Sequence, residues 1–100
     1  MKIYTNLKLL REDVMKLIHS KRYEINWRHI RTHHPDIKEI EILNTLIYGI
    51  YGFDKKHKEE GYISKAKFPY RTGWVRVAFM VKKVNGQLVV VITAFEEEKT

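Results

Sequence analysis

The residues best suited to acid–base chemistry in this sequence are histidines in its first third. His29 and His33 are four positions apart, so on a helix they would share one face. Such a pair could supply half of a zinc site, but Ile30 follows His29 where a H-E-x-x-H motif has glutamate. Imidazoles can also exchange protons near neutral pH without a metal, and the simplest alternative is that they are surface histidines. We take His29 and His33 as candidate catalytic residues that need no metal, with His34 as an alternative.

Cationic, hydroxyl and aromatic residues in the second half would suit a reaction on RNA. The ribose 2′-hydroxyl is an internal nucleophile, so a protein has only to remove its proton, stabilise the phosphate and protonate the departing oxygen. Arg71 or Arg76 could supply the cation, and Tyr70 and Thr93 could donate hydroxyls near the phosphate. Tyr70 and Trp74 could stack on an unpaired base. This chemistry requires no cofactor.

The chain is strongly basic, which favours an anionic partner. Its 100 residues carry a formal net charge of +7. The resulting field attracts polyanions, with nucleic acid first, although an acidic protein would also be attracted. With no cysteine, the chain has no disulfide framework, thiolate nucleophile or cysteine-based zinc site. It also lacks an apolar stretch near the ~20 residues of a membrane span and the apolar core of a signal peptide, so we expect a single cytoplasmic domain over 1–100 that does not enter membranes.

Helical spacing dominates the first part of the chain. Apolar residues recur at helical intervals over 7–19, between charged residues, which predicts an amphipathic helix. Residues 23–25 are a short strand candidate. Asn26 can cap a short helix over 27–33, and this helix would carry the histidine pair.

A further helix is expected after the histidines. Pro35 disfavours helical geometry at the preceding residue, and Asp36 can cap a new helix that Gly49 would end. Its expected apolar residues are Ile37, Ile40, Leu43, Leu46 and Ile47. The stretch 51–61 holds two glycines and a run of charges without an apolar stripe, so it predicts a mobile loop.

From Tyr62 onward the pattern is that of β-strands. Residues 75–83 and 88–95 are rich in β-branched side chains and flank the dipeptide Asn85-Gly86. Asn-Gly is the strongest short hairpin signal, because a type I′ turn needs positive φ at both central residues. These elements together predict an α+β fold in which N-terminal helices pack on a C-terminal antiparallel sheet of three to four strands.

The expected hairpin fixes a register. If Val84 faces Gln87, one face of the hairpin is wholly apolar, and we expect a helix to cover it. Its pairs are Val77 with Ala94, Phe79 with Ile92 and Val81 with Val90. The alternate face pairs Arg76 with Phe95, Ala78 with Thr93, Met80 with Val91 and Lys82 with Val89. Arg76 and Thr93 then become diagonal neighbours, and Lys82 adds a candidate RNA-binding cation to the same face.

The order of these features resembles a known group of proteins. The segment Trp27-Arg28-His29-Ile30-Arg31-Thr32-His33-His34-Pro35-Asp36, an amphipathic helix, and the closing strand Val90-Val91-Ile92-Thr93-Ala94-Phe95 resemble small RelE-like toxins. More broadly the chain is similar to the barnase, EndoU, colicin and RelE-like ribonucleases. The resemblance, which covers roughly 23–95, implies that His29 or His33 is the helical catalytic histidine, Arg76 or Arg71 the strand cation and Thr93 the hydroxyl of the last strand. It also implies an acidic antitoxin protein as partner.

Three functions therefore compete. The leading prediction is a metal-independent endoribonuclease of toxin type that uses 2′-hydroxyl attack. The alternatives are a nonenzymatic RNA-binding domain that uses the same basic and aromatic face, with Arg71, Tyr70, Trp74 and Lys82, and a protein-interaction domain.

Overall fold

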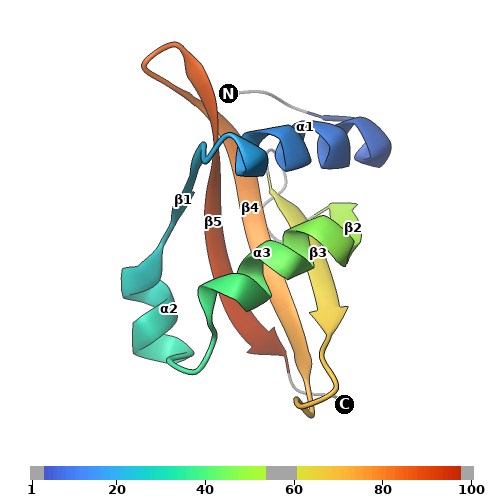
Figure 1. Cartoon of the computed structure of the whole chain (residues 1–100), viewed down its shortest axis with the longest axis vertical. Helices are drawn as coiled ribbons and strands as arrows, with labels where there is room; N and C mark the ends of the chain where they lie inside the picture. Colours follow the sequence, from blue (N-terminus) through green and yellow to red (C-terminus); the bar gives the residue numbers. More distant parts are fainter. Residues whose placement is uncertain (1–3, 54–60, 98–100) are drawn as a thin grey trace.

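A computed structural model describes residues 4–53 and 61–97 of this chain (Figure 1). Its helices and strands, in chain order, are α1 (Leu7–His19), β1 (Tyr23–Ile25), α2 (Trp27–His33), α3 (Glu39–Tyr48), β2 (Ile50–Phe53), β3 (Tyr62–Lys67), β4 (Trp74–Val84) and β5 (Gln87–Glu97). The α+β class and the N-terminal position of the helices are confirmed. No helix in the described ranges is long and apolar enough to cross a bilayer.

The sheet has more strands than predicted. Five strands follow the order β1-β5-β4-β3-β2, and β1 runs parallel to β5 while the other neighbours are antiparallel (Figure 1). β1 joins because its flanking backbone groups find partners on β5: Asn26 donates its N–H to the Ile92 carbonyl, and Val90 donates to the Arg22 carbonyl. β2 occupies the start of the predicted loop, so the loop prediction was wrong over 51–53. Residues 54–60 of that loop lie outside the described residues, and Gly61 lies in neither a helix nor a strand.

The first two helices have the predicted bounds, whereas the third begins later than expected. Asn6 caps α1, and Asn26 caps α2 by accepting the backbone N–H of His29 at 3.3 Å. The N-cap of α3 is Lys38 and not Asp36, because the Asp36 carboxylate pairs with Arg71 instead. The predicted stripe of α3 is also partly wrong, since Ile40 is 61 % exposed and the helix buries Glu41.

The hairpin follows its predicted register. Val84 pairs with Gln87, and the pairs continue through Phe79 with Ile92 and Ala78 with Thr93. Asn85 and Gly86 have φ of 51° and 79°, as a type I′ turn requires.

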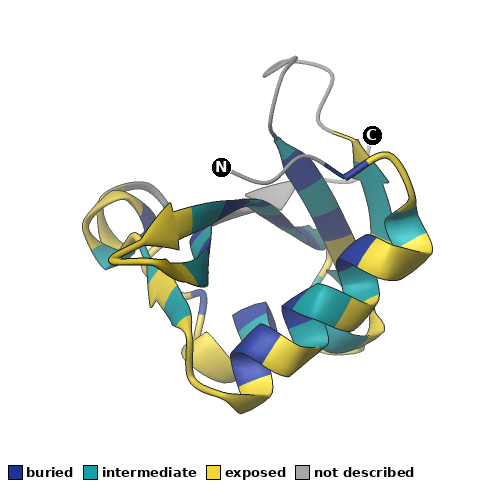
Figure 2. Ribbon diagram, turned by 90° about the horizontal axis from the view of Figure 1, so that it is seen from above, coloured by how far each residue is buried: buried dark blue, intermediate teal, exposed yellow. Residues whose placement is uncertain are grey.

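One face of the sheet carries the core. α1 and α3 lie across this face (Figure 1), and buried residues gather where helices and sheet meet, with exposed residues on the outer sides of the helices (Figure 2). The strand residues buried there are Tyr62, Ser64, Val75, Val77, Phe79, Val81, Val90 and Ile92. Burial of each aliphatic side chain stabilises the fold by about 1.5–3 kcal/mol, so these contacts hold the helices on the sheet. The prediction that a helix covers the apolar face of the hairpin is therefore confirmed.

The junction between α3 and β2 depends on close packing at Gly49. A Cβ on this residue would lie 2.3 Å from the Thr45 carbonyl oxygen and 2.4 Å from the Ser64 hydroxyl. Ser64 donates that hydroxyl to the Thr45 carbonyl at 2.6 Å, and the Arg11 guanidinium donates to the Gly49 carbonyl. These contacts fix the last turn of α3 against β3.

Candidate nucleic-acid interface

The second face of the sheet points away from α1 and α3, and we call it the open face. It is formed by alternate residues of the strands: Trp74, Arg76, Ala78, Met80 and Lys82 of β4, Val89, Val91 and Thr93 of β5, and Ile63, Lys65 and Lys67 of β3. Because these positions alternate with the buried ones, three of the predicted functional residues of β4 and the Thr93 of β5 share one surface. The face combines cations with apolar side chains.

A cavity of about 220 Å³ lies on the open face near Thr93. Ala78, Met80 and Val91 supply apolar lining, and Asn26 and Gly61 also border it. Ala78 is directly opposite Thr93 in the register, so its small side chain leaves space beside the hydroxyl. The cavity therefore places a polar group in a mainly apolar hollow.

Thr93 presents an unusual buried hydroxyl. Its Oγ1 is shielded from solvent and has no hydrogen-bond partner among the residues that the structure describes. A buried hydroxyl without a partner costs roughly 1–3 kcal/mol, so such groups are usually satisfied by a ligand or water. Arg76, the diagonal neighbour of Thr93, has a buried Nε. Thr93 lines the cavity, and Arg76 lies on the same face of β4, two residues before the lining residue Ala78.

The candidate histidines lie on α2, which packs against β5 (Figure 1). His29 is exposed in the first turn, and its backbone N–H bonds to the side chain of Asn26, the same residue that borders the cavity. His33 is the last residue of α2, and its side chain lies outside the described part of the chain. Asn26, the cap of α2, therefore connects the first turn of α2, which carries His29, to the rim of the cavity.

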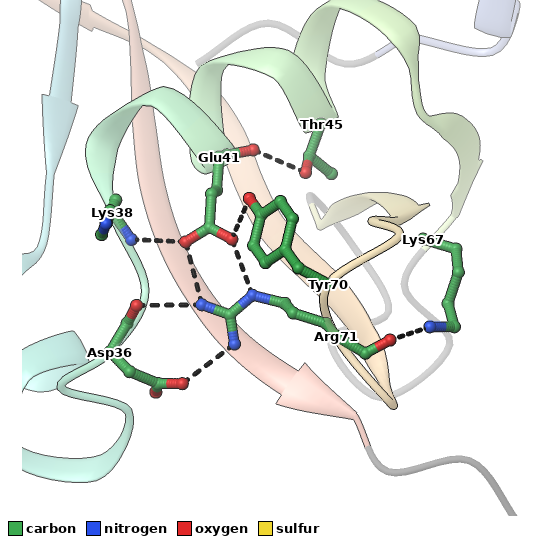
Figure 3. A network of polar contacts seen from close by, with 7 residues as sticks. All are labelled: Asp36, Lys38, Glu41, Thr45, Lys67, Tyr70 and Arg71. Carbon is green, nitrogen blue, oxygen red and sulfur yellow. Dashed lines mark hydrogen bonds and ion pairs between the residues drawn. The ribbon is translucent and has the colours of Figure 1, made fainter.

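Arg71 and Tyr70 lie elsewhere, in a polar network beside α3 (Figure 3). Arg71 donates from Nε to Glu41 Oε2 at 2.6 Å and from Nη2 to Oε1 at 2.9 Å, while Nη1 meets Asp36 Oδ2 at 3.0 Å. Tyr70 donates its hydroxyl to Glu41 Oε2 at 2.7 Å, and the Lys38 backbone N–H donates to Oε1. The Arg71 side chain is only 8 % exposed. The network ties the β3–β4 connection to the start of α3, and an RNA-binding role for Arg71 and Tyr70 stays a prediction.

The electrostatics of this network follow from its charges. Hydrogen bonding from Arg71 is the main cause that lowers the pKa of Glu41 from 4.5 to about 2, and burial opposes it. The hydrogen bond to Glu41 in turn raises the pKa of Tyr70. Glu41 is therefore a carboxylate across the physiological range.

Trp74 and Lys82 occupy opposite ends of the open face of β4. Trp74 pairs with Lys67 in the register, and the ammonium of Lys65 lies 5.2 Å from the Trp74 ring centroid. Lys82 is half-buried opposite Val89. The open face of β3 and β4 thus carries cations at Lys65, Lys67, Arg76 and Lys82.

The sequence interpretation missed Glu41 as a partner of Arg71. A glutamate flanked by Ile40 and Ile42 in an apolar helix is a signal for a buried ion pair, but nothing in the sequence says which cation it meets. In the described ranges no three His, Cys, Asp or Glu side chains come together in a way that could hold a metal ion.

Comparisons with protein-family models, with curated proteins and with solved structures found no match. The RelE-like resemblance therefore stays a prediction.

Proposed function

We propose that this protein is a metal-independent endoribonuclease of toxin type, with a RelE-like fold. The observation that carries the proposal is the juxtaposition of Arg76 and the Thr93 hydroxyl, which has no partner in the described part of the chain, next to a cavity bordered by the cap of α2. The net charge of +7 supports an anionic substrate.

The proposed reaction needs only groups that the chain carries. An imidazole of α2, from His29 or His33, takes the proton of a ribose 2′-hydroxyl, and the oxygen attacks the adjacent phosphorus. The bond from phosphorus to the 5′-oxygen breaks, and a second protonated imidazole or water returns a proton to that oxygen. The products are a 2′,3′-cyclic phosphate and a 5′-hydroxyl end.

Arg76 and Thr93 have complementary roles in this proposal. The guanidinium of Arg76 balances the negative charge that develops on the phosphate oxygens, and Thr93 donates its hydroxyl to one of them. The mainly apolar lining of the cavity strengthens both interactions, because water that would compete for the phosphate is reduced there.

A cleavage assay in excess chelator tests the proposal. An oligoribonucleotide and its all-deoxy analogue would be incubated with the parent protein and with His29→Ala and His33→Ala. We expect cleavage of RNA alone, a 2′,3′-cyclic phosphate product, and a loss of roughly 10²–10⁴-fold in one of the two variants, as removal of a general acid or base produces. His19→Ala is the matched control, because His19 is an exposed histidine at the end of α1.

Two results would contradict the ribonuclease. If both histidine variants still cleave RNA, neither His29 nor His33 of α2 is the catalytic imidazole. Intact RNA with a folded parent that is free of co-purified inhibitor would leave a nonenzymatic RNA-binding domain as the better account.

A toxin also requires a neutralising partner. We expect an acidic antitoxin protein that covers the open face, because its carboxylates would complement the cations there. Growth arrest on expression of this chain, relieved by co-expression of a short acidic protein encoded beside it, would support this part of the proposal.

A further inference from the structure

A groove separate from the cavity beside Thr93 lies at the β2 edge of the sheet. Lys65 of β3 pairs with Ile50, the first residue of β2, whereas Ala66 and Lys67 pair only with β4 within the described part of the chain. The last turn of α3 stands beside this gap, and the groove between them encloses about 430 Å³. Its lining includes Asn44, Tyr48, Lys65, Lys67, Phe68 and Trp74. We call it the edge groove.

The edge groove combines exposed aromatic rings with ammonium groups. Tyr48 is 79 % exposed and Ile50 is 62 % exposed, so large apolar side chains that a fold normally covers face solvent here. Lys65 lies over the Trp74 ring, and Lys67 donates its ammonium to the Arg71 carbonyl, which holds both cations at the groove. None of the described residues that line it is acidic. The groove therefore fits a ligand with flat apolar faces and negative charge.

We infer that the edge groove binds an unpaired nucleotide of the RNA strand whose cleavage is proposed above, and the inference rests on that proposed function. The base stacks on Trp74 and Tyr48, and the flanking phosphates bind Lys65 and Lys67. The Asn44 amide can donate to and accept from the edge of a base. The volume lies within the range of roughly 300–1,000 Å³ that small-molecule sites occupy.

The edge groove and the proposed reaction site are joined by a row of cations. Lys65 is the backbone partner of Arg76, and Arg76 precedes Ala78, the partner of Thr93, on the open face. Lys65 and Thr93 lie on strands two positions apart in the sheet and are offset by two residues along the strands, which gives a backbone separation of about 12 Å. A single strand can therefore cross from the cavity over Arg76 to the edge groove. An acidic peptide would engage the lysines but would leave the aromatic faces without a matching planar group.

Binding of an uncleavable strand tests the inference apart from catalysis. The probe is a fluorescent single-stranded octanucleotide with 2′-O-methyl riboses, and the readout is anisotropy over a series of salt concentrations. We expect Tyr48→Ala and Trp74→Ala each to weaken binding by roughly 5- to 100-fold, the range that loss of a stacked base spans. Lys65→Ala should weaken binding and make it less dependent on salt. The matched control is Phe53→Ala on β2, which removes a 47 % exposed aromatic ring outside the groove and should leave binding unchanged.

The outcomes test the edge groove separately from the proposed ribonuclease activity. Binding by the parent that falls in the groove variants, without cleavage of natural RNA, supports the edge groove while the ribonuclease fails. Unchanged affinity in Tyr48→Ala overturns the edge groove whatever the cleavage assay shows, and because this ring is largely exposed the variant keeps the fold even if Trp74→Ala does not. Competition by polyglutamate as strong as that by the unlabelled oligonucleotide would overturn the inference in favour of an acidic protein partner.

Discussion

Replacement of Glu41 by glutamine removes the charge at the centre of the network in Figure 3 while keeping nearly the same side-chain volume. Glu41 is 2 % exposed, and the side chain of Arg71 that it faces is 8 % exposed. The substituted side chain would present a neutral amide to a guanidinium that stays shielded from water. Asp36, which is 66 % exposed, would be the remaining counterion and would compensate only in part.

The size of the effect follows from the pKa of Glu41. Its decrease from 4.5 to about 2 corresponds to about 3 kcal/mol at ~1.36 kcal/mol per pKa unit. Breaking a buried ion pair by removing one partner costs a similar ~3–5 kcal/mol. We therefore expect Glu41→Gln to lower the free energy of unfolding at pH 7 by about 2–4 kcal/mol, a large share of the ~5–15 kcal/mol that small domains possess.

The pH dependence of the free energy of unfolding distinguishes the contribution of this ion pair from that of apolar packing, which does not change with pH. Because the pKa of Glu41 is lower in the folded state, its stabilisation is fully present above pH 4.5 and is lost as the pH falls toward about 2. The parent should lose this contribution over that window, whereas Glu41→Gln has none to lose. The difference between the two free energies of unfolding should therefore shrink as the solution is acidified.

Urea unfolding followed by circular dichroism, from pH 7 down to the lowest pH at which the parent remains folded, measures this difference. Glu39→Gln is the matched control, since Glu39 lies in the same helix turn but is exposed. A Glu41→Gln effect that is below about 1 kcal/mol at pH 7, or equally large at every pH, would refute the role assigned to the ion pair.

Three further predictions concern stability at single sites. Gly49→Ala should lower the free energy of unfolding by about 1–3 kcal/mol, because the added Cβ would collide with backbone and hydroxyl oxygens. Gly52→Ala is the control in the same urea assay and should have a much smaller effect, because nothing lies within 4 Å of its added Cβ. Gly86→Ala should cost about 1 kcal/mol, since φ of 79° strains any residue with a Cβ; a neutral result would contradict the type I′ turn. Thr93→Val should leave stability unchanged or raise it by up to about 1 kcal/mol while it lowers RNA cleavage, because the hydroxyl has no partner in the described fold; a loss of stability would assign Thr93 a structural role.

The features that the sequence predicts well are those set by neighbouring residues. The bounds of α1 and α2 follow from their caps and apolar spacing, and the β4–β5 register follows from a single dipeptide whose backbone geometry admits few turns. The same register brings Arg76 and Thr93 together before any tertiary contact is known. Interactions between residues close together in the sequence are therefore sufficient to predict the central part of the candidate site, which is the pair Arg76 and Thr93.

Features that depend on distant partners could not be predicted in this way. β2 contains Gly52 and directly follows Gly49. It forms because β3 pairs with it residue by residue, because the Tyr51 ring contacts Phe79, and because the Phe53 ring contacts Tyr62. Asp36 is a good capping residue that instead bonds Arg71, thirty-five positions later in the chain. In both cases the local sequence allows two conformations, and the contact with a distant residue determines which one forms. A single sequence does not reveal the energies of such contacts.

The two candidate arginines illustrate how fold context separates equal residue types. Arg71 lies in the connection after β3, where its guanidinium faces the buried Glu41, so its replacement should act first on the free energy of unfolding. Arg76 lies within the alternation of β4, on the face turned away from α1 and α3 and beside Thr93. Arg76 lies two residues before Ala78, which lines the cavity beside Thr93, whereas Arg71 lies in the separate network beside α3. For this reason we assign the phosphate of the proposed reaction to Arg76.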